Sequence, residues 1–350
     1  MKEVKVGLIG LGFMGTTHFR IYKELPNVRI AAVADVDPVK LTGDISKVIG
    51  NIGDFDNSIP FDMTGIEVYT DALEMIKNAD VDMIDICVPT PKHMDYILAG
   101  FAAGKHVFCE KPLCRTYEQI KTIRDAVAAT DRFFNVGMCL RQDPPYRHTY
   151  ELLQSGKLGK VKSASLKRFS PSVDGNAWEN WFMKEEMSGG AIQDMHLHDT
   201  DAIRYFFGKP ESVISTGGKG MVSDKGIDHV NTTYFYSDGK YVTAEGGWEF
   251  SKSIPFYFDY KIVCEKATIK CVLDDYTICW NDGTIETPEL ELGNLPTGWH
   301  RELAYFTDCV RDNVKPDKYQ TPESIFDAVA VIMAEIESVE SRKEVEVKYV

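Results

Sequence analysis

The most constraining feature of this sequence is a glycine-spaced turn close to its first residue. Gly10, Gly12 and Gly15 stand in the order G-x-G-x-x-G. The turn directly follows a short apolar run, Val4–Gly10, and opens a segment of helical periodicity, Gly15–Leu25. A strand that turns tightly into a helix lets the backbone approach a pyrophosphate, which the N–H groups at the helix start can bind. The glycine spacing alone is a weak signal, but this context predicts a dinucleotide-binding unit.

A carboxylate follows this turn at the position that such units use for the adenosine ribose. The second strand-like run, Arg29–Asp35, ends in Asp35, about 20 residues after Gly15. Asp35 is predicted to accept hydrogen bonds from the ribose hydroxyls. Because a carboxylate repels a 2′-phosphate, the cofactor is expected to be NAD rather than NADP. Phe13 and Met14, between the glycines, are further candidates for cofactor contact.

Strand-like and helix-like segments alternate over the first ~140 residues, which predicts an α/β domain with a parallel sheet. Further strands are expected at Ile66–Tyr69, Met83–Val88, His106–Glu110 and Phe133–Met138, with helices at Asp71–Asn78, His93–Ala103 and Tyr117–Ala129. Their continuous apolar character is typical of a sheet covered on both faces. Ile49–Gly65 interrupts this order, and its Gly, Asp, Asn and Pro residues predict a long surface loop.

The pattern changes after about residue 160 to segments rich in β-branched and aromatic residues, with few helices between them. These segments are Lys162–Ser170, His229–Tyr236, Tyr241–Trp248 and Tyr257–Cys264, and Asp238-Gly239 marks a hairpin turn. They predict a second, α+β domain with a mainly antiparallel sheet. Two helices, Trp299–Val314 and Pro322–Ser341, close the chain. We expect a Rossmann domain at 1–125 and a substrate-binding and oligomerisation domain at 126–350, with the C-terminal helix packing back on the first.

Composition narrows the function classes. The formal net charge is −14, which argues against a nucleic-acid partner because phosphate backbones require clustered Lys and Arg. No apolar run approaches the ~20 residues of a membrane span. The first residues lead straight into a strand without a signal peptide, so a cytoplasmic location is expected. The eight cysteines form no C-x-x-C pair, which favours reduced, buried thiols over a zinc ribbon.

One candidate catalytic residue follows a strand of the first domain. Glu110-Lys111-Pro112 comes directly after His106–Glu110, at the carboxyl edge where open α/β sheets bind ligands. A lysine at this edge can hold a substrate hydroxyl and lower its pKa. From position alone, Lys111 fits a solvated surface lysine equally well.

A dense titratable cluster follows the Gly189-Gly190 turn. Asp194 and His198 stand four residues apart, which places them on one face of a helix. Dehydrogenation of an alcohol requires a base for the hydroxyl proton, and a neutral histidine suits that role near pH 7. Two other interpretations remain open. Asp194, His196 and His198 could ligate a metal, or the acidic residues could cap a helix over Asp199–Phe207.

With both motifs placed, the chain resembles the glucose–fructose oxidoreductase / inositol dehydrogenase family (Gfo/Idh/MocA) over nearly its whole length. The segments that carry the resemblance are Gly10–Gly15, Ala32–Asp35, Val88–His93, Ala103–Val107, Glu110–Pro112, Arg141-x-Asp143-Pro144, Ser155–Gly159 and the block from Gly189 to Asp201. The E-K-P and D-x-x-x-H elements are specific only together. The sequence departs from the common family pattern in Ser188, in His196 and in the length of Ile49–Gly65.

The resemblance implies an open-faced sheet that commonly mediates oligomerisation, here a dimer or tetramer. It implies Lys111, Asp194 and His198 as the catalytic trio, with His198 as acid and base and the other two positioning the hydroxyl. It also implies that Thr90, Pro91, His93 and Glu110 line the cofactor together with Lys111. No metal is expected. The Lys111–Pro112 bond is expected to be cis, as is common in the family.

The expected activity is reversible, NAD(H)-dependent oxidation of a secondary ring hydroxyl on a sugar, glycoside or cyclic polyol. Substrate contacts are assigned to Lys111, Arg168, Trp178, Asp194 and His198, although Trp178 and Trp181 could equally be packing residues of a loop. An alternative is an NAD-dependent glycosidase or lyase that oxidises its substrate only transiently and releases no NADH. A non-catalytic NAD-sensing regulator is a further alternative, which an intact catalytic trio disfavours.

Overall fold

The computed structural model describes residues 3–50, 56–173, 175, 178–290 and 293–350. The chain divides into two compact units. The first unit comprises residues 1–139, 175–181 and 299–323, and the second comprises 140–174, 182–298 and 324–350.

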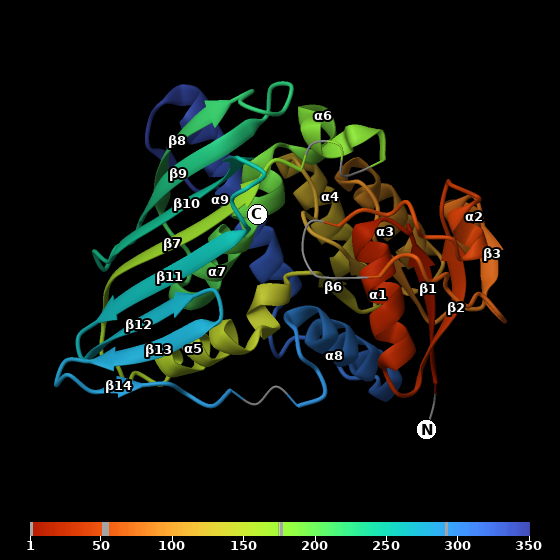
Figure 1. Cartoon of the computed structure of the whole chain (residues 1–350), viewed down its shortest axis with the longest axis horizontal. Helices are drawn as coiled ribbons and strands as arrows, with labels where there is room; N and C mark the ends of the chain where they lie inside the picture. The colour runs from red at the N-terminus through yellow and green to blue at the C-terminus, as the bar shows by residue number, and fades with distance from the viewer. Residues whose placement is uncertain (1–2, 51–55, 174, 176–177, 291–292) are drawn as a thin grey trace. The chain divides into compact units, whose positions relative to one another are not determined.

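The first unit contains a six-stranded parallel sheet with the strand order β3-β2-β1-β4-β5-β6 (Figure 1). Its strands are β1 (Val4–Ile9), β2 (Val28–Ala34), β3 (Glu67–Tyr69), β4 (Met83–Ile86), β5 (His106–Cys109) and β6 (Phe134–Val136). Its helical segments are α1 (Phe13–Glu24), η1 (Lys40–Thr42), α2 (Ala72–Asn78), η2 (Thr90–Lys92), α3 (His93–Ala102), α4 (Tyr117–Ala128) and α8 (Gly298–Asp312), of which Gly298 falls in the second unit. This is the doubly wound order of a Rossmann fold, which confirms the predicted class.

The expected domain boundary differs from the observed one. Residue 125 lies inside α4, and the sheet continues beyond it to β6, so the first unit extends to Cys139. The late segment that belongs to this unit is Trp299–Glu323, which includes most of α8. The C-terminal helix, α9 (Pro322–Ser341), belongs almost entirely to the second unit.

The second unit contains a nine-stranded sheet with the order β14-β13-β12-β11-β7-β10-β9-β8-β15. Its strands are β7 (Val161–Pro171), β8 (Ser212–Lys219), β9 (Ile227–Phe235), β10 (Tyr241–Phe250), β11 (Tyr257–Cys264), β12 (Ala267–Val272), β13 (Asp275–Trp280), β14 (Ile285–Glu286) and β15 (Val345–Glu346). Among the described residues, neighbouring strands of this sheet pair in antiparallel fashion except β7 and β10, which are parallel. The mainly antiparallel sheet and the β9–β10 hairpin are therefore confirmed.

Several elements of the second unit were not predicted. They are α5 (Pro144–Gln154), β8 and the strands β12 to β15. β8 ends in a Gly-Gly-Lys sequence that reads as a turn, and β12 and β13 are only six residues long, so their alternation is too brief to stand out. The remaining helical segments are η3 (Cys139–Gln142), η4 (Trp178–Met183), α6 (Glu185–Ser188), η5 (Ile192–His196) and α7 (Leu197–Phe207).

The structure bears on two expectations from the composition, the state of the cysteines and the lack of a membrane span. All eight cysteines are free, and six of them are buried, as predicted. Among the described residues, no helix is long and apolar enough to cross a membrane.

Two buried ion pairs attach α7 to its surroundings within the second unit. The Arg168 guanidinium, on β7, donates two hydrogen bonds of 2.9 and 3.1 Å to the Asp199 carboxylate. Arg141 makes the same forked contact with Asp201, at 2.9 and 2.6 Å. The interpretation of Asp199 as a helix cap is therefore wrong: helical structure begins before it, and its carboxylate neutralises a buried arginine.

Removal of one partner from such a pair leaves the other charge buried and unpaired. We expect Asp199→Ala to lower the free energy of unfolding by about 3–5 kcal/mol. Glu151→Ala is the control, because it removes an exposed pair with Arg147 and should cost less than about 1 kcal/mol. Denaturant titration followed by tryptophan fluorescence compares the two. Equal losses would show that the buried pair does not stabilise the unit.

Candidate active site

The glycine turn forms a cradle at the start of α1. Gly10 has a φ of +92°, and a Cβ there would lie 2.4 Å from the carbonyl oxygen of Cys87. A Cβ at Gly15 would lie 1.8 Å from the carbonyl oxygen of Gly10, whereas one at Gly12 would meet nothing within 4 Å. Gly12, at the N-cap of α1, has no side chain to cap the helix, and the first turn of α1 carries no acidic residue. The open space and the positive helix end therefore suit a pyrophosphate.

Asp35 stands directly after β2, beside this cradle. One carboxylate oxygen accepts the N–H of Leu11 at 2.6 Å, and the other accepts the N–H of Asp37 at 2.8 Å. The Lys40 ammonium lies 3.5 Å from the same carboxylate. Asp35 thus links the glycine turn to the end of β2, where its predicted contact with a ribose remains compatible with the geometry.

The E-K-P loop follows β5, and its Lys111–Pro112 bond is cis, as predicted. Burial lowers the pKa of the neighbouring His93, so its ring is neutral and carries one N–H. Its nitrogens lie 2.9 Å from the Pro112 carbonyl and 2.8 Å from the Val88 carbonyl, and the ring donates to one of them at a time. His93 therefore connects the E-K-P loop to the loop after β4. Lys111 is partly exposed, whereas Thr90 is buried at the start of η2.

A buried network lies beneath the E-K-P loop. The imidazole of His18, on α1, lies 2.8 Å from the Asp85 carboxylate through Nδ1 and 3.2 Å from the Glu110 carboxylate through Nε2. The other oxygen of Glu110 accepts the backbone N–H of Lys111 at 3.1 Å. A Cβ at Gly137 would lie 2.6 Å from Glu110, so only glycine leaves room there. His18 therefore supports Glu110, which in turn holds the backbone of the E-K-P loop.

The neighbours of His18 and Glu302 in this network shift the pKa values of both groups. Burial alone would lower the pKa of His18, but the neighbouring Cys87 and Asp85 reverse the effect and raise the pKa well above its ordinary value. Burial, followed by repulsion from Glu110, raises the pKa of Glu302 well above its ordinary value, so Glu302 keeps its proton near pH 7. A protonated imidazole between the Asp85 and Glu110 carboxylates is the consequence.

The same network contains the side chains that come closest to metal-ligand spacing in the described part of the chain. His18 with Asp85 and Cys87, and His18 with Glu110 and Glu302, place their ligand atoms within 4.8 Å of one another. A protonated His18 offsets the charge of one of the two carboxylates that face it. The alternative metal set of Asp194, His196 and His198 does not gather in this way among the described residues.

In the second unit, two adjacent glycines start the helix that carries the other candidate residues. Gly189 and Gly190 have φ values of +82° and +80°, and a Cβ at Gly190 would lie 2.7 Å from the backbone nitrogen of Ile227. The chain then enters η5, a π-helical turn, and continues directly into α7. A single π turn within a helix is rare and often occurs at functional sites.

Burial along this helix singles out two residues. From Ala191 to Ile203 every residue is buried except Asp194 and His198, which are partly exposed. The two predicted residues therefore share the accessible side of an otherwise buried helix. Lys111 belongs to the first unit and Asp194 and His198 to the second, so the predicted trio is drawn from both units.

The structure does not place the other two predicted substrate-binding residues, Arg168 and Trp178, on an accessible surface. Arg168 is buried, and besides Asp199 it donates a hydrogen bond of 3.0 Å to the Tyr146 hydroxyl. These contacts give Arg168 a structural task, and a substrate contact stays a prediction. Trp178 starts η4, but its side chain lies outside the described residues.

The loop Ile49–Gly65 packs against α1 over the part that the structure describes. The Phe61 ring stacks on Phe19 with centroids 4.0 Å apart, and Asn57 accepts a hydrogen bond of 2.7 Å from Arg20. Residues 51–55 of this loop lie outside the described residues.

Comparison with known proteins agrees with this geometry. The family described as "Oxidoreductase family, NAD-binding Rossmann fold" matches residues 4–138, and the GFO/IDH/MocA C-terminal domain matches residues 146–270. The chain belongs to the Gfo/Idh/MocA family. Its first unit is accordingly an NAD-binding Rossmann domain, which confirms both the expected family and the expected cofactor.

Individual Gfo/Idh/MocA proteins are similar over part of their length. Inositol 2-dehydrogenase of Rhizobium meliloti is 31% identical over 229 residues, which is 64% of this chain and 61% of that protein. Levoglucosan dehydrogenase of Pseudarthrobacter phenanthrenivorans is 29% identical over 61% of this chain and 53% of that protein. The chain thus matches a little more than half the length of these relatives.

Solved structures share the fold over the full length. A levoglucosan dehydrogenase in complex with NADH and L-sorbose has a TM-score of 0.85 at 20% identity, covering 100% of both chains. Apo scyllo-inositol dehydrogenase from Lactobacillus casei has a TM-score of 0.77 at 23% identity, covering 99% of this chain and 98% of that one.

Sequence reasoning did not identify the residues that support the site. His18 stands three positions after Gly15 on an apolar helix, where a histidine without a visible partner is an ambiguous signal. Its partners Asp85 and Glu110 lie 67 positions or more along the chain. A carboxylate within the apolar strand β4 was the one available sign of a buried network.

The first prediction from this site concerns cofactor choice. We expect the protein to bind NAD more tightly than NADP, and Asp35→Ser to narrow the difference, because the substitution removes charge repulsion and weakens ribose binding. Lys40→Ala is the informative control: it removes the ammonium beside Asp35 and should widen the difference. Dissociation constants from titration calorimetry measure both. Equal constants for NAD and NADP in the unmodified protein would contradict the role of Asp35.

The second prediction from this site concerns the pH dependence of the stability that His18 contributes to the buried network. Because the folded pKa of His18 is raised, its contribution to stability is complete below the unfolded pKa of about 6.5 and is lost as pH rises through the folded pKa. The difference in unfolding free energy between wild type and His18→Gln should therefore shrink as pH rises above neutrality. His300→Gln, which replaces a less buried histidine, is the control. A difference that is constant across alkaline pH would refute the charged state of His18.

Proposed function

We propose that this protein is an NAD(H)-dependent oxidoreductase that reversibly oxidises a secondary ring hydroxyl of a sugar, glycoside or cyclic polyol to a ketone. The observation that carries the proposal is the burial pattern of the helix in the second unit. Between Ala191 and Ile203, only Asp194 and His198 are partly exposed. A carboxylate and an imidazole on one accessible side of a fixed helix suit proton transfer.

The relatives support the substrate class. The similar proteins are named as dehydrogenases of inositol and of levoglucosan, and a levoglucosan dehydrogenase with this fold was solved with NADH and levoglucosan. Both compounds are rings bearing secondary hydroxyls. We assign the same class of substrate to this chain without choosing one compound.

Each residue of the proposed trio has a distinct task. The Lys111 ammonium holds the substrate hydroxyl and lowers its pKa, while Asp194 orients the hydroxyl and the base. His198, as a neutral imidazole, takes the hydroxyl proton during oxidation and returns it during reduction. When bound, the nicotinamide supplies the hydride acceptor. Glu110 fixes the backbone N–H of Lys111, so the loop that presents the lysine is held in place.

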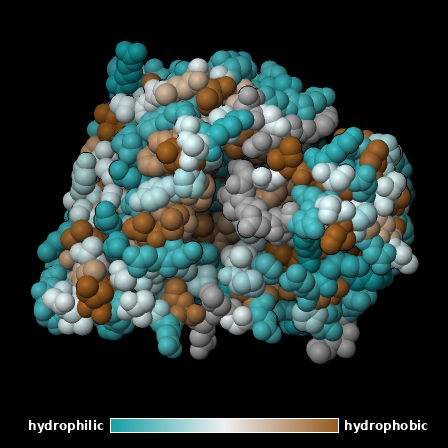
Figure 2. Space-filling model, viewed as in Figure 1, coloured by the Kyte–Doolittle hydropathy of each residue, from teal (hydrophilic) through white to brown (hydrophobic). Residues whose placement is uncertain are grey.

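We also propose that the second unit forms a homo-oligomer through the open face of its sheet, opposite η5 and α7. Hydrophobic patches lie among hydrophilic residues on this face (Figure 2). Exposed apolar side chains on this face come from β8, β9, β10 and β11 and are Ile214, Phe235, Tyr241 and Val263. Such a mixed surface is typical of an interface between proteins that also fold alone.

The activity is tested by incubating the protein with NAD and a panel of inositols, monosaccharides, levoglucosan and aryl glycosides. We expect NADH to accumulate with at least one cyclic polyol or sugar. Product formation without net NADH would instead indicate a glycosidase or lyase with transient oxidation. Tight NAD binding without turnover of any compound would favour the regulator.

The acid–base assignment is tested by His198→Ala. We expect kcat to fall about 10²–10⁴-fold, with the dissociation constant of NAD nearly unchanged, because the histidine handles only the substrate proton. Lys111→Ala should impair both kcat and substrate affinity. Near-normal turnover by His198→Ala at saturating substrate would identify Lys111 as the base and His198 as a binding residue.

A further inference from the structure

His196 lies between the two proposed catalytic residues, yet it is fully buried in the second unit. Its Nε2 lies 3.1 Å from a carboxylate oxygen of Glu335, on α9, and 3.4 Å from the hydroxyl of Tyr234. The other oxygen of Glu335 accepts a hydrogen bond of 3.0 Å from the hydroxyl of Thr200, one turn further along the same helix. One Glu335 carboxylate thus contacts the helix at two places, through a hydrogen bond from Thr200 and a close approach to the His196 ring.

The sheet leaves room for this imidazole. A Cβ at Gly246, within β10, would lie only 3.0 Å from Nδ1 of His196 and 3.2 Å from the carbonyl oxygen of Arg168. Glycine inside a strand is unfavourable unless another group must approach closely. Gly246 therefore matches His196 by shape, and a larger residue at 246 would displace the ring.

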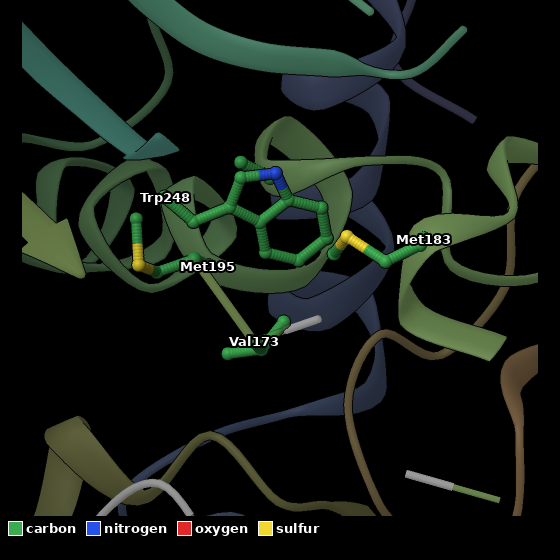
Figure 3. Close-up of a cluster of buried hydrophobic side chains, with 5 residues drawn as sticks. Val173, Met183, Met195 and Trp248 are labelled. Carbon is green, nitrogen blue, oxygen red and sulfur yellow. The ribbon is translucent and has the colours of Figure 1, made fainter. Parts of the chain in front are cut away.

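Apolar packing also holds the π turn. Met195 packs with Ala191 against Trp248, Val173 and Met183 (Figure 3). The indole N–H of Trp248 donates a hydrogen bond of 2.6 Å to the buried carboxylate of Asp228, which fixes the ring. Consecutive residues of η5 thus face different anchors: Met195 an apolar cluster, and His196 a carboxylate.

This arrangement bears on the catalytic pair because the π turn lies between its members. Asp194 is inside the turn, and His198 is in the first turn of α7. Relaxation of the π turn to regular α-helical geometry would change the angle between the two side chains about the helix axis. Misplacement by about 1 Å is enough to reduce a rate about 10²-fold.

We infer that the Glu335–His196 pair is a positioning device that holds the π turn and thereby sets the relative orientation of Asp194 and His198. His196 is a positioning residue and not a catalytic one, since its ring is fully buried. The inference rests on the proposed function for its effect on turnover, but not for its effect on the helix.

The test compares Glu335→Gln and His196→Ala with Ser338→Ala as the matched control. Gln keeps the shape of Glu335 and removes its charge. Ser338 is a buried polar residue on the same helix, α9, and it bonds the N–H of Ser215 and the carbonyl of Lys343 instead of His196. All variants are the full chain, assayed with NAD and the best cyclic substrate found, starting from myo-inositol and levoglucosan.

We expect Glu335→Gln and His196→Ala each to lower kcat about 10–10²-fold, with little change in KM or in the dissociation constant of NAD. The double variant should be no slower than either single variant, because both changes break the same contact. Ser338→Ala should retain the wild-type kcat. The inference would be overturned if Glu335→Gln had the wild-type kcat. It would also be overturned if the fall in kcat of the double variant equalled the product of the two single falls.

Hydrogen exchange provides a readout that does not require a substrate. We expect the amides of Ile192–His198 to exchange faster in Glu335→Gln than in Ser338→Ala. Unchanged exchange there would refute the positioning role even if no compound is turned over. If His198→Ala is inactive while Glu335→Gln has normal turnover and exchange, the inference fails and the proposed function stands. If His198→Ala is fully active, the catalytic assignment fails instead.

Discussion

A buried charge must meet an opposite charge, and this requirement organises the helix that runs from η5 into α7. The helix carries Asp199 and Asp201 into the interior of the second unit, where each is neutralised by an arginine in a forked pair. Besides these two ion pairs, the His196 ring lies 3.1 Å from the Glu335 carboxylate in the same interior. Because removing one partner of a buried pair is strongly destabilising, these contacts fix the rotation of the helix about its own axis. This rotation leaves Asp194 and His198 on the accessible side of the helix.

The Rossmann unit meets the same requirement around His18. Asp85 stands on β4 and Glu110 directly follows the neighbouring parallel strand β5, and a protonated imidazole from α1 lies between them. The helix that offers its N-terminus to the pyrophosphate is thereby connected to the loop that presents Lys111. Cofactor cradle and lysine loop are parts of one rigid network, which is the kind of support that a site needs when misplacement by about 1 Å is costly.

Local patterns allowed much of this to be predicted. The glycine turn, Asp35 and the parallel sheet follow from motifs within some 30 residues of one another, and the hairpin at Asp238-Gly239 follows from its turn residues. Predictions were weaker where the deciding contact was remote. Asp199 looked like a helix cap because its sequence neighbours resemble a helix start, whereas its partner Arg168 is 31 positions away. The first unit extends past the expected boundary at 125 to Cys139, because β6, a strand that the sequence did predict, pairs with β5 in its sheet.

The D-x-x-x-H spacing shows where sequence reasoning reaches its limit. Residues four positions apart on a helix lie on the same face, so the pairing of Asp194 with His198 could be predicted without a structure. The π turn between them could not, because π geometry depends on what holds the turn open. One residue that contacts the turn is Trp248, more than 50 positions later in the sequence. The other is Glu335 on α9, which lies 135 positions after its second partner, Thr200. The short motif thus specifies the reactive groups, Asp194 and His198. Their relative orientation depends on distant residues that the motif does not contain. The same argument explains why His196 looked like a departure from a pattern: its reason for being there lies on α9.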